Sequence, residues 1–236
     1  MGLKQHIPNI VTLASLLAGL IAIPFLFQGR WDFVALCIGI SLLCDFLDGF
    51  LARLLRASSE LGKQLDSFSD LVSFGVVPGL AVFLQLKQGI STELAMGGVE
   101  PLPFLGFLIP LASALRLAKF NLSPPSEKFQ GLPTPANALL ILSLVLITFY
   151  YPDSTIAKWL TFPLSWILVI GISCGLMLYP ITLFSLKFSN VSVADNWFRY
   201  LFLAISTLGL IFFDFLAIPF VITFYLLLSV SLNLRG

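Results

Sequence analysis

The sequence predicts an all-α polytopic membrane protein, and three observations support this class. The chain of 236 residues is 58% hydrophobic and only 11% charged, whereas about 25% charged residues are usual in a soluble domain. Its mean hydropathy is +0.99, and its apolar runs are continuous and approach the roughly 20 residues with which a helix crosses a bilayer. A transmembrane β-barrel would instead show alternating segments of about ten residues. The formal net charge of +1 gives no basis for nucleic-acid binding.

Eight helical spans follow from the apolar runs and from the glycine- and proline-containing stretches between them. They cover approximately 8–28, 31–56, 62–87, 101–121, 134–151, 160–186, 197–213 and 215–233. The last two are separated only by a tight turn near Asp214 and can form a re-entrant pair. Because neither a soluble domain nor an internal repeat is visible, we predict a single membrane domain over 1–236.

The basic residues predict the orientation in the membrane. With the N-terminus in the cytoplasm and eight crossings, ten of the thirteen Lys and Arg residues fall on the cytoplasmic side and three on the other. Cytoplasmic loops characteristically carry such an excess. Both termini and the connection over 54–62 are then expected to be cytoplasmic.

The most unusual stretch runs from Asp45 to Asp70 and places four aspartates in two otherwise apolar helices. Asp45 and Asp48 lie on the second span and Asp66 and Asp70 on the third. At about 100° per residue, each pair falls on one face of its helix. The short connection makes the helices antiparallel neighbours, so the four carboxylates are expected to meet at the cytoplasmic end of the membrane.

Four clustered carboxylates repel one another unless cations neutralise them. Hard divalent ions that prefer oxygen ligands, such as Mg²⁺, Mn²⁺ or Ca²⁺, are the natural occupants, and four carboxylates can hold two of them. A pair of such ions suits phosphoryl displacement. The small residues Gly49, Ala52 and Gly62 leave room for a phosphorylated ligand, or alternatively form a close helix-packing face. Arg53 can pair with a phosphate.

These residues follow the spacing D-x2-D-G-x2-A-R-x8-G-x3-D-x3-D over 45–70. In this spacing the chain resembles the CDP-alcohol phosphotransferase family. The resemblance implies an integral membrane enzyme with six core helices, usually a homodimer, that joins a CDP-linked donor to an alcohol and releases CMP. We therefore expect a catalytic core over 1–186 and additional helices over 187–236.

The resemblance also implies roles for the motif residues. Asp45, Asp48, Asp66 and Asp70 correspond to the ligands of two metal ions, for which Mg²⁺ or Mn²⁺ is expected, with Ca²⁺ as a substitute or inhibitor. Asp70 corresponds to the general base. The nucleotide and diphosphate are expected to contact the small residues and the arginine of the motif, namely Gly49, Ala52, Arg53 and Gly62.

Further stretches are similar to the phosphatidylserine synthases of bacteria and archaea. They are IPNIVTLASLLAGL (7–20), LDSFSDLVSFGVVPGL (65–80), ALRLAKFN (114–121) and FQGLPTPANA (129–138). The similarity implies a bacterial or archaeal cytoplasmic membrane, CDP-diacylglycerol as donor and L-serine as acceptor. At Lys119 the similar enzymes more usually have an arginine, so bidentate phosphate geometry is lost there.

Residues outside the motif are candidates for substrate contacts. Asn9 and Thr12 can hydrogen-bond the nucleotide or mark the start of the first helix. The cytoplasmic-side cations are candidates for binding the serine carboxylate or the lipid phosphate. They are Arg116, Lys119 and Lys128, and they can equally be positive charges that only set the orientation in the membrane. Gly131 can shape the acceptor pocket or serve only as a turn.

Two alternatives remain open at this point. Inositol phosphate, glycerol phosphate or a related alcohol can replace serine as acceptor, but a phosphorylated acceptor requires more arginines. The aspartates can also belong to an ion transporter. Transport predicts acidic or broken-helix sites spread through the membrane depth, often in repeated halves, whereas here the acids cluster at one end of two helices.

Overall fold

A computed structural model of the protein describes residues 3–89, 101–123, 129–183 and 193–233. Helices dominate these residues, as the sequence predicts. They are α1 (Leu3–Phe27), α2 (Trp31–Leu54), α3 (Glu60–Asp70), the π-helix η1 (Leu71–Val76), α4 (Val77–Gly89), the 3₁₀ helix η3 (Leu102–Phe107), α5 (Leu108–Leu122), α6 (Thr134–Tyr150), α7 (Thr155–Leu160), α8 (Pro163–Leu178), α9 (Val193–Phe213), the 3₁₀ helix η4 (Asp214–Leu216) and α10 (Ala217–Asn233).

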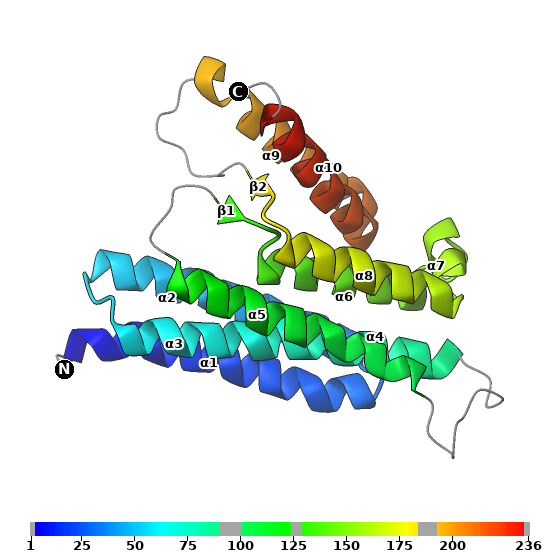
Figure 1. The fold of residues 1–236 in the computed structure, drawn as a ribbon, viewed down its shortest axis with the longest axis horizontal. Helices are drawn as coiled ribbons and strands as arrows, with labels where there is room; N and C mark the ends of the chain where they lie inside the picture. Colours follow the sequence, from blue (N-terminus) through cyan, green and yellow to red (C-terminus); the bar gives the residue numbers. More distant parts are fainter. Residues whose placement is uncertain (1–2, 90–100, 124–128, 184–192, 234–236) are drawn as a thin grey trace.

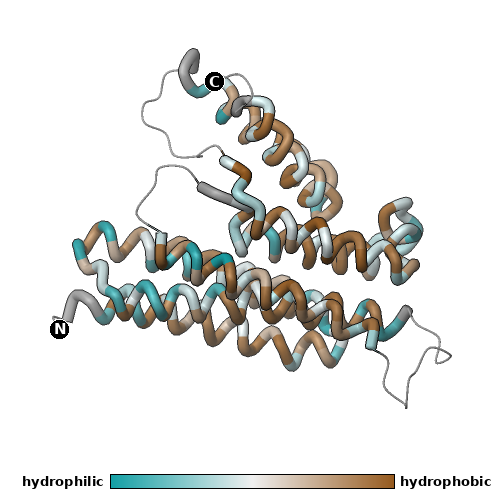
Figure 2. The backbone as a smooth tube through the Cα atoms, viewed as in Figure 1, coloured by the Kyte–Doolittle hydropathy of each residue, from teal (hydrophilic) through white to brown (hydrophobic). Residues whose placement is uncertain are grey.

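The helices confirm the predicted class of all-α polytopic membrane protein. Five described segments are long and apolar enough to cross a membrane: His6–Phe27, Trp31–Leu54, Glu60–Gln88, Leu102–Leu122 and Asn196–Ser231. The last of these contains both α9 and α10, and α6 and α8 are shorter apolar helices. Apolar residues cover most of the helix surfaces, whereas hydrophilic residues gather toward the end of the bundle where α2 leads into α3 (Figure 2). Such an apolar exterior suits a lipid environment.

Long helices lie side by side in one bundle, and the last two form a separate hairpin (Figure 1). α1 packs against α2 and α3, while α5 packs against η1 and α8. α6 contacts α4, α10 and η1. The hairpin of α9 and α10 crosses the bundle at an angle and reaches it mainly through α10 (Figure 1). The segment α3–η1–α4 is therefore surrounded by other helices.

Three tight turns reverse the chain between consecutive helices, and each contains a residue with positive φ. Gly29 (φ 68°) joins α1 to α2, Arg56 (φ 49°) joins α2 to α3, and Asp214 (φ 46°) joins α9 to α10. The turn near Asp214 confirms the predicted reversal. After Arg56, the Ser59 hydroxyl accepts a hydrogen bond of 3.0 Å from the Gly62 amide and so caps the N-terminus of α3. The aspartate-bearing helices are consequently antiparallel neighbours.

Small residues let η1 approach its neighbours closely. A Cβ placed on Gly19 of α1 would lie 2.9 Å from the Ser73 Cα, and one placed on Gly75 would lie 3.1 Å from the Ser113 Cβ of α5. The Ser73 hydroxyl donates to the Ser15 carbonyl oxygen at 3.3 Å. These contacts fix η1, which directly follows Asp70 in the sequence, between α1 on one side and α5 on the other.

The predicted span over 160–186 is wrong at its C-terminal end. The short helix α7 precedes α8, and α8 ends at Leu178, because Tyr179 precedes Pro180 and adopts an extended conformation. The chain then forms the strand β2 (Thr182–Leu183), which pairs antiparallel with β1 (Phe129–Gln130). This strand pair ties the segment before α6 to the segment after α8. The first span is also longer than predicted, since α1 begins at Leu3.

The described core is mainly apolar, and the polar side chains buried in it are mostly serines. Val77 and Val82 of α4, Ile109 of α5, and Ile141 and Val145 of α6 are all fully buried or nearly so. The three cysteines are free. Polar groups inside such a core are costly unless they have partners, which makes the buried ones informative.

Candidate functional site

Four aspartates project from the facing sides of α2 and α3. Asp45 and Asp48 lie in the second half of α2, and Asp66 and Asp70 lie in the second half of α3. One carboxylate oxygen from each of Asp45, Asp48 and Asp66 lies within 4.8 Å of the other two. Asp70 interacts electrostatically with the other three. The structure thus confirms that the two aspartate pairs meet.

Burial makes this cluster energetically demanding. Asp48 is only 6% exposed. Its Oδ2 atom and the Oδ1 atom of Asp70 are buried, and neither has a hydrogen-bond partner among the described residues. No lysine or arginine in the described ranges forms an ion pair with the four carboxylates. These two buried oxygens therefore lack the hydrogen-bond partners that normally accompany buried polar groups.

A divalent cation fits this ligand set. Carboxylate oxygens are preferred by hard cations such as Mg²⁺, Mn²⁺ and Ca²⁺, and the unpartnered oxygens of Asp48 and Asp70 are free to ligate. The 4.8 Å span of the three carboxylate oxygens of Asp45, Asp48 and Asp66 brings them within reach of one ion. We conclude that the aspartate cluster can hold a divalent metal.

Small residues beside the cluster have different surroundings. A Cβ on Gly49 would have nothing within 4 Å, so the space next to this residue is open. A Cβ on Gly62 would lie 3.0 Å from the Asn9 Oδ1 atom and 3.1 Å from the Ser59 Oγ atom. Gly49 therefore borders open space, whereas Gly62 belongs to a close contact with α1. Ala52 is half-buried on α2, one turn beyond Gly49.

The arginine of the motif lies at the exposed end of α2. The Arg53 Nε atom donates to the Gly49 carbonyl oxygen at 3.0 Å. Its guanidinium group is thus held beside the open space at Gly49. The predicted role in phosphate binding stays a prediction.

Asn9 and Thr12 approach the site from α1. The interpretation of Pro8 and Asn9 as the start of the first helix is wrong, because α1 begins five residues before Pro8 and contains this proline in its interior. Thr12 is 4% exposed, donates to the Pro8 carbonyl oxygen at 3.1 Å and also lies beside the Asp48 carboxylate. Asn9 contacts the Gly62 region. Both side chains are therefore next to the motif residues.

The candidate cations differ in their surroundings. Arg116 of α5 is half-buried, lies close enough to Asp70 to interact with its charge, and donates to the Thr134 hydroxyl at 3.3 Å. Lys119, near the end of α5, is exposed. Lys128 lies outside the described residues. Among the described candidates, Arg116 is the cation adjacent to the aspartates.

Gly131 is a turn residue held against the end of α8. Its φ is +71°, and its amide donates to the Ile181 carbonyl oxygen at 2.9 Å. A Cβ here would lie 2.6 Å from the Met177 carbonyl oxygen. The turn interpretation is confirmed, and a contribution to the acceptor pocket stays a prediction.

Sequence reasoning missed a hydrogen-bonded link between α3 and α5. The Lys63 ammonium donates to the Asn121 carbonyl oxygen at 2.9 Å, and the Asn121 amide donates to the Ser67 hydroxyl at 2.8 Å. The Lys63 ammonium lies at the C-terminal end of α5, where a cation is favourable. The link holds the helix of Asp66 and Asp70 beside the helix of Arg116.

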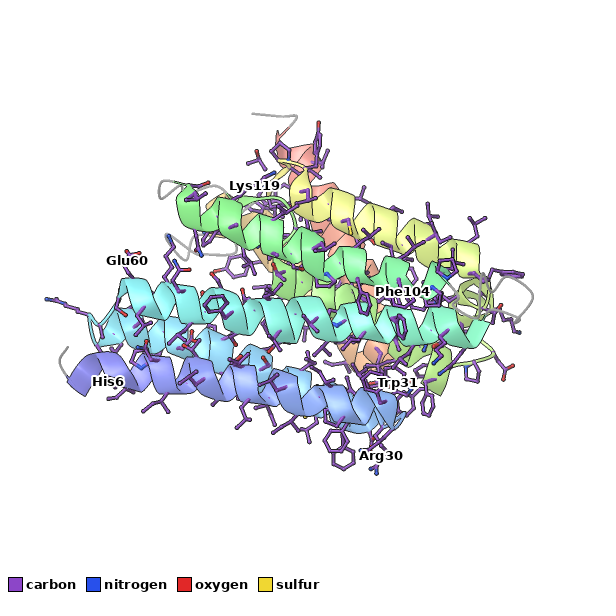
Figure 3. The ribbon with its side chains drawn as sticks, turned by 60° about the horizontal axis from the view of Figure 1, so that its bottom comes forward. His6, Arg30, Trp31, Glu60, Phe104 and Lys119 are labelled. Atoms are coloured by element: carbon purple, nitrogen blue, oxygen red, sulfur yellow. The ribbon has the colours of Figure 1, made fainter. Side chains whose placement is uncertain are left out.

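The site lies toward one end of the bundle. His6 of α1, Glu60 of α3 and Lys119 of α5 lie at this end, and Arg30, Trp31 and Phe104 lie at the opposite end (Figure 3). The connection between α2 and α3 is at the same end as His6 and Glu60 (Figures 1 and 3). The aspartates therefore lie toward the end of the bundle that contains the connection between α2 and α3.

Comparison with known sequences agrees with this geometry. The sequence model of the CDP-alcohol phosphatidyltransferase family matches residues 5–176. The chain belongs to this family. The match includes α2, α3 and α5 and stops just before the end of α8, so all four aspartates of this CDP-alcohol phosphatidyltransferase lie inside it.

Curated relatives carry a more specific name, CDP-diacylglycerol–serine O-phosphatidyltransferase. The chain is 35% identical to the Bacillus subtilis protein over 152 residues, which is 62% of the chain and 77% of that protein. It is 31% identical to the Mycobacterium leprae protein over 201 residues, covering 82% of the chain and 62% of the relative. For the Methanocaldococcus jannaschii protein the identity is 33% over 152 residues, which is 64% of the chain and 66% of that protein. The matches thus span less than two thirds of the last two relatives.

Proposed function

We propose that this protein transfers the phosphatidyl group of CDP-diacylglycerol to L-serine, producing phosphatidylserine and CMP. The observation that carries the proposal is the cluster of aspartates at one end of a membrane bundle, in which buried oxygens of Asp48 and Asp70 have no hydrogen-bond partner among the described residues. Such a cluster suits a metal-assisted reaction of a phosphorylated lipid. The names of the relatives support CDP-diacylglycerol as donor and serine as acceptor.

The reaction forms one bond and breaks one bond at the lipid-side phosphorus. The serine hydroxyl oxygen attacks this phosphorus while Asp70 takes the hydroxyl proton. The bond from this phosphorus to the oxygen shared with CMP breaks, and CMP departs with the electron pair. Asp70 suits the role of base because one of its carboxylate oxygens has no partner among the described residues.

Asp45, Asp48, Asp66 and Asp70 would hold divalent ions, which we propose to be two Mg²⁺ or Mn²⁺ ions, with Ca²⁺ as a substitute or inhibitor. When bound, such ions supply neutralisation of the diphosphate charge and of the charge on departing CMP. The nucleotide end of the donor is proposed to lie against the open space at Gly49. Further proposed contacts of the nucleotide and diphosphate are Asn9, Thr12, Ala52, Arg53 and Gly62.

Arg116 supports an amino-acid acceptor. Its guanidinium group lies next to Asp70 and can bind the serine carboxylate while the serine hydroxyl meets the base. Of the other nearby cations in the described ranges, Lys63 is engaged with Asn121 and Lys119 is exposed. Arg116 is therefore the basic side chain beside Asp70. A phosphorylated alcohol, which carries more negative charge, would require more cations here.

The proposed arrangement extends to the whole chain. The positive-inside distribution supports a cytoplasmic position for both termini and for the site, in a bacterial or archaeal cytoplasmic membrane. Residues 1–186 are proposed as the catalytic core and 187–236 as an addition, since the family match ends at residue 176. The family resemblance implies a homodimer. A measurement of the mass of the purified protein in detergent tests this assembly.

The deciding experiment follows radiolabelled serine into lipid. Purified protein in mixed micelles is given CDP-diacylglycerol, Mg²⁺ or Mn²⁺, and labelled serine. We expect labelled phosphatidylserine and an equal amount of CMP. Robust incorporation of glycerol phosphate or inositol phosphate without serine incorporation would refute the serine assignment. Because detergent micelles hold no ion gradient, CMP release there also excludes a function limited to transport.

A further inference from the structure

One polar side chain in the core has no place in the reaction described above. Asn137 lies in the first half of α6 and is 0% exposed. Neither its Oδ1 atom nor its Nδ2 atom has a hydrogen-bond partner in the described part of the chain. A buried amide without partners destabilises a fold, and an apolar residue would pack here without this penalty. Its presence therefore calls for a polar group that it contacts.

The position of Asn137 connects it to the aspartate site. Thr134 and Asn137 are three residues apart on α6 and so lie on the same face of the helix. Thr134 is fully buried and accepts the hydrogen bond from Arg116, whose neighbour is Asp70. α6 itself packs against η1, the segment that follows Asp70. Asp70, Arg116 and Thr134 thus form a polar path from the carboxylates to α6, and Asn137 lies about one turn further along the same face of that helix.

Arg116 also has an unsatisfied donor on this path. Its Nε atom is buried without a partner among the described residues. The unused groups are therefore the Nε donor of Arg116 and both a donor and an acceptor at Asn137. A zwitterion carries the complementary groups, because its carboxylate accepts hydrogen bonds and its ammonium donates them. A plain alcohol or a hydroxy acid matches only part of this set.

We propose that Asn137 and Arg116 form the subsite for the amino-acid part of the acceptor. Arg116 binds the carboxylate, and the Asn137 Oδ1 atom accepts a hydrogen bond from the ammonium group. This inference rests on the proposed function and adds to it a residue that selects an amino acid over an acceptor without an amine. The acceptor hydroxyl is then left to face Asp70.

The test measures acceptor selection in the full-length protein. Asn137→Ala and Asn137→Leu are compared with the native protein by the KM for serine, the KM for CDP-diacylglycerol and the thermal melting temperature. Ser143→Ala is the matched control, since Ser143 is also buried on α6 but donates to the Leu140 carbonyl oxygen of its own helix. We expect at least a tenfold rise in the KM for serine in both Asn137 variants, with the KM for CDP-diacylglycerol within twofold. The control should leave both constants unchanged.

A competition measurement on the native protein tests the subsite even if the Asn137 variants do not fold. 3-Hydroxypropionate keeps the hydroxyl and carboxylate of serine but lacks the amine, so it should compete with serine at least tenfold more weakly than unlabelled serine does. This preference should largely disappear in the Asn137 variants. Equal competition in the native protein, or a serine KM within twofold in Asn137→Leu, would overturn the subsite. A native protein that makes no phosphatidylserine would instead refute the proposed function.

Discussion

Replacing Gly49 by alanine separates the stability of the fold from the binding of the donor. A Cβ at this position has nothing within 4 Å, so the added methyl group meets no protein atom. Gly49 lies inside α2, where alanine is favoured over glycine by about 0.5–1 kcal/mol. The fold alone therefore predicts a more stable protein, with a folding equilibrium shifted by about two- to fivefold.

The proposed position of the nucleotide predicts the opposite effect on activity. If the donor lies against the Cα atom of Gly49, the methyl group of alanine occupies space that the donor requires. We expect the KM for CDP-diacylglycerol to rise by about tenfold or more, which corresponds to about 1.4 kcal/mol of binding free energy. Stability and donor affinity should thus change in opposite directions.

Gly39→Ala provides the matched control for this variant. Gly39 is also an interior residue of α2, and a Cβ there also meets nothing within 4 Å, but it lies before the aspartates. Both variants should raise the melting temperature in detergent, and only Gly49→Ala should impair CMP release at low donor concentration. Unchanged donor kinetics in Gly49→Ala would show that the donor does not lie beside α2 at this point.

Three further predictions concern the aspartates and their support. Asp70→Asn should lower turnover by about a hundredfold or more, as expected for loss of a general base, and near-normal turnover would remove Asp70 from that role. Asp48→Asn and Asp66→Asn should raise the metal concentration for half-maximal activity by about tenfold or more, and an unchanged requirement would contradict their role as ligands. Asn121→Ala loses the hydrogen bond to Ser67 and should destabilise the protein by about 0.5–1.5 kcal/mol; an unchanged melting temperature would show that this link contributes nothing.

The sequence predicts the aspartate cluster because helical periodicity and a short connection determine it. Two residues spaced by three or four lie on one face of a helix, and the tight turn at Arg56 makes α2 and α3 neighbours. These local rules bring the carboxylates of Asp45, Asp48 and Asp66 together, as observed. The start of α1 follows a weaker rule, since Pro8 suits both a helix start and, as here, a helix interior.

Other features depend on tertiary contacts that no local pattern contains. Asn137 lies in an apolar run, and nothing in its sequence neighbours distinguishes a buried, unpartnered amide from an exposed one. The strands β1 and β2 have two residues each and form because the ends of α6 and α8 are held together. Lys63 reaches the Asn121 carbonyl oxygen only because the tertiary fold brings the end of α5 close to α3.

The π-helix η1 changes how residue spacing in this region relates to helix faces. A π-helical turn contains one residue more than an α-helical turn, and one residue corresponds to about 100° of rotation. A helical wheel drawn without a break through α3, η1 and α4 therefore misassigns the face of every residue after Val76. The correct relation between Asp70 and the buried residues of α4 depends on the number of residues in η1 as well as on their identity. A deletion of one residue within Leu71–Val76 should accordingly be more harmful to the site than a conservative substitution at any of the six positions.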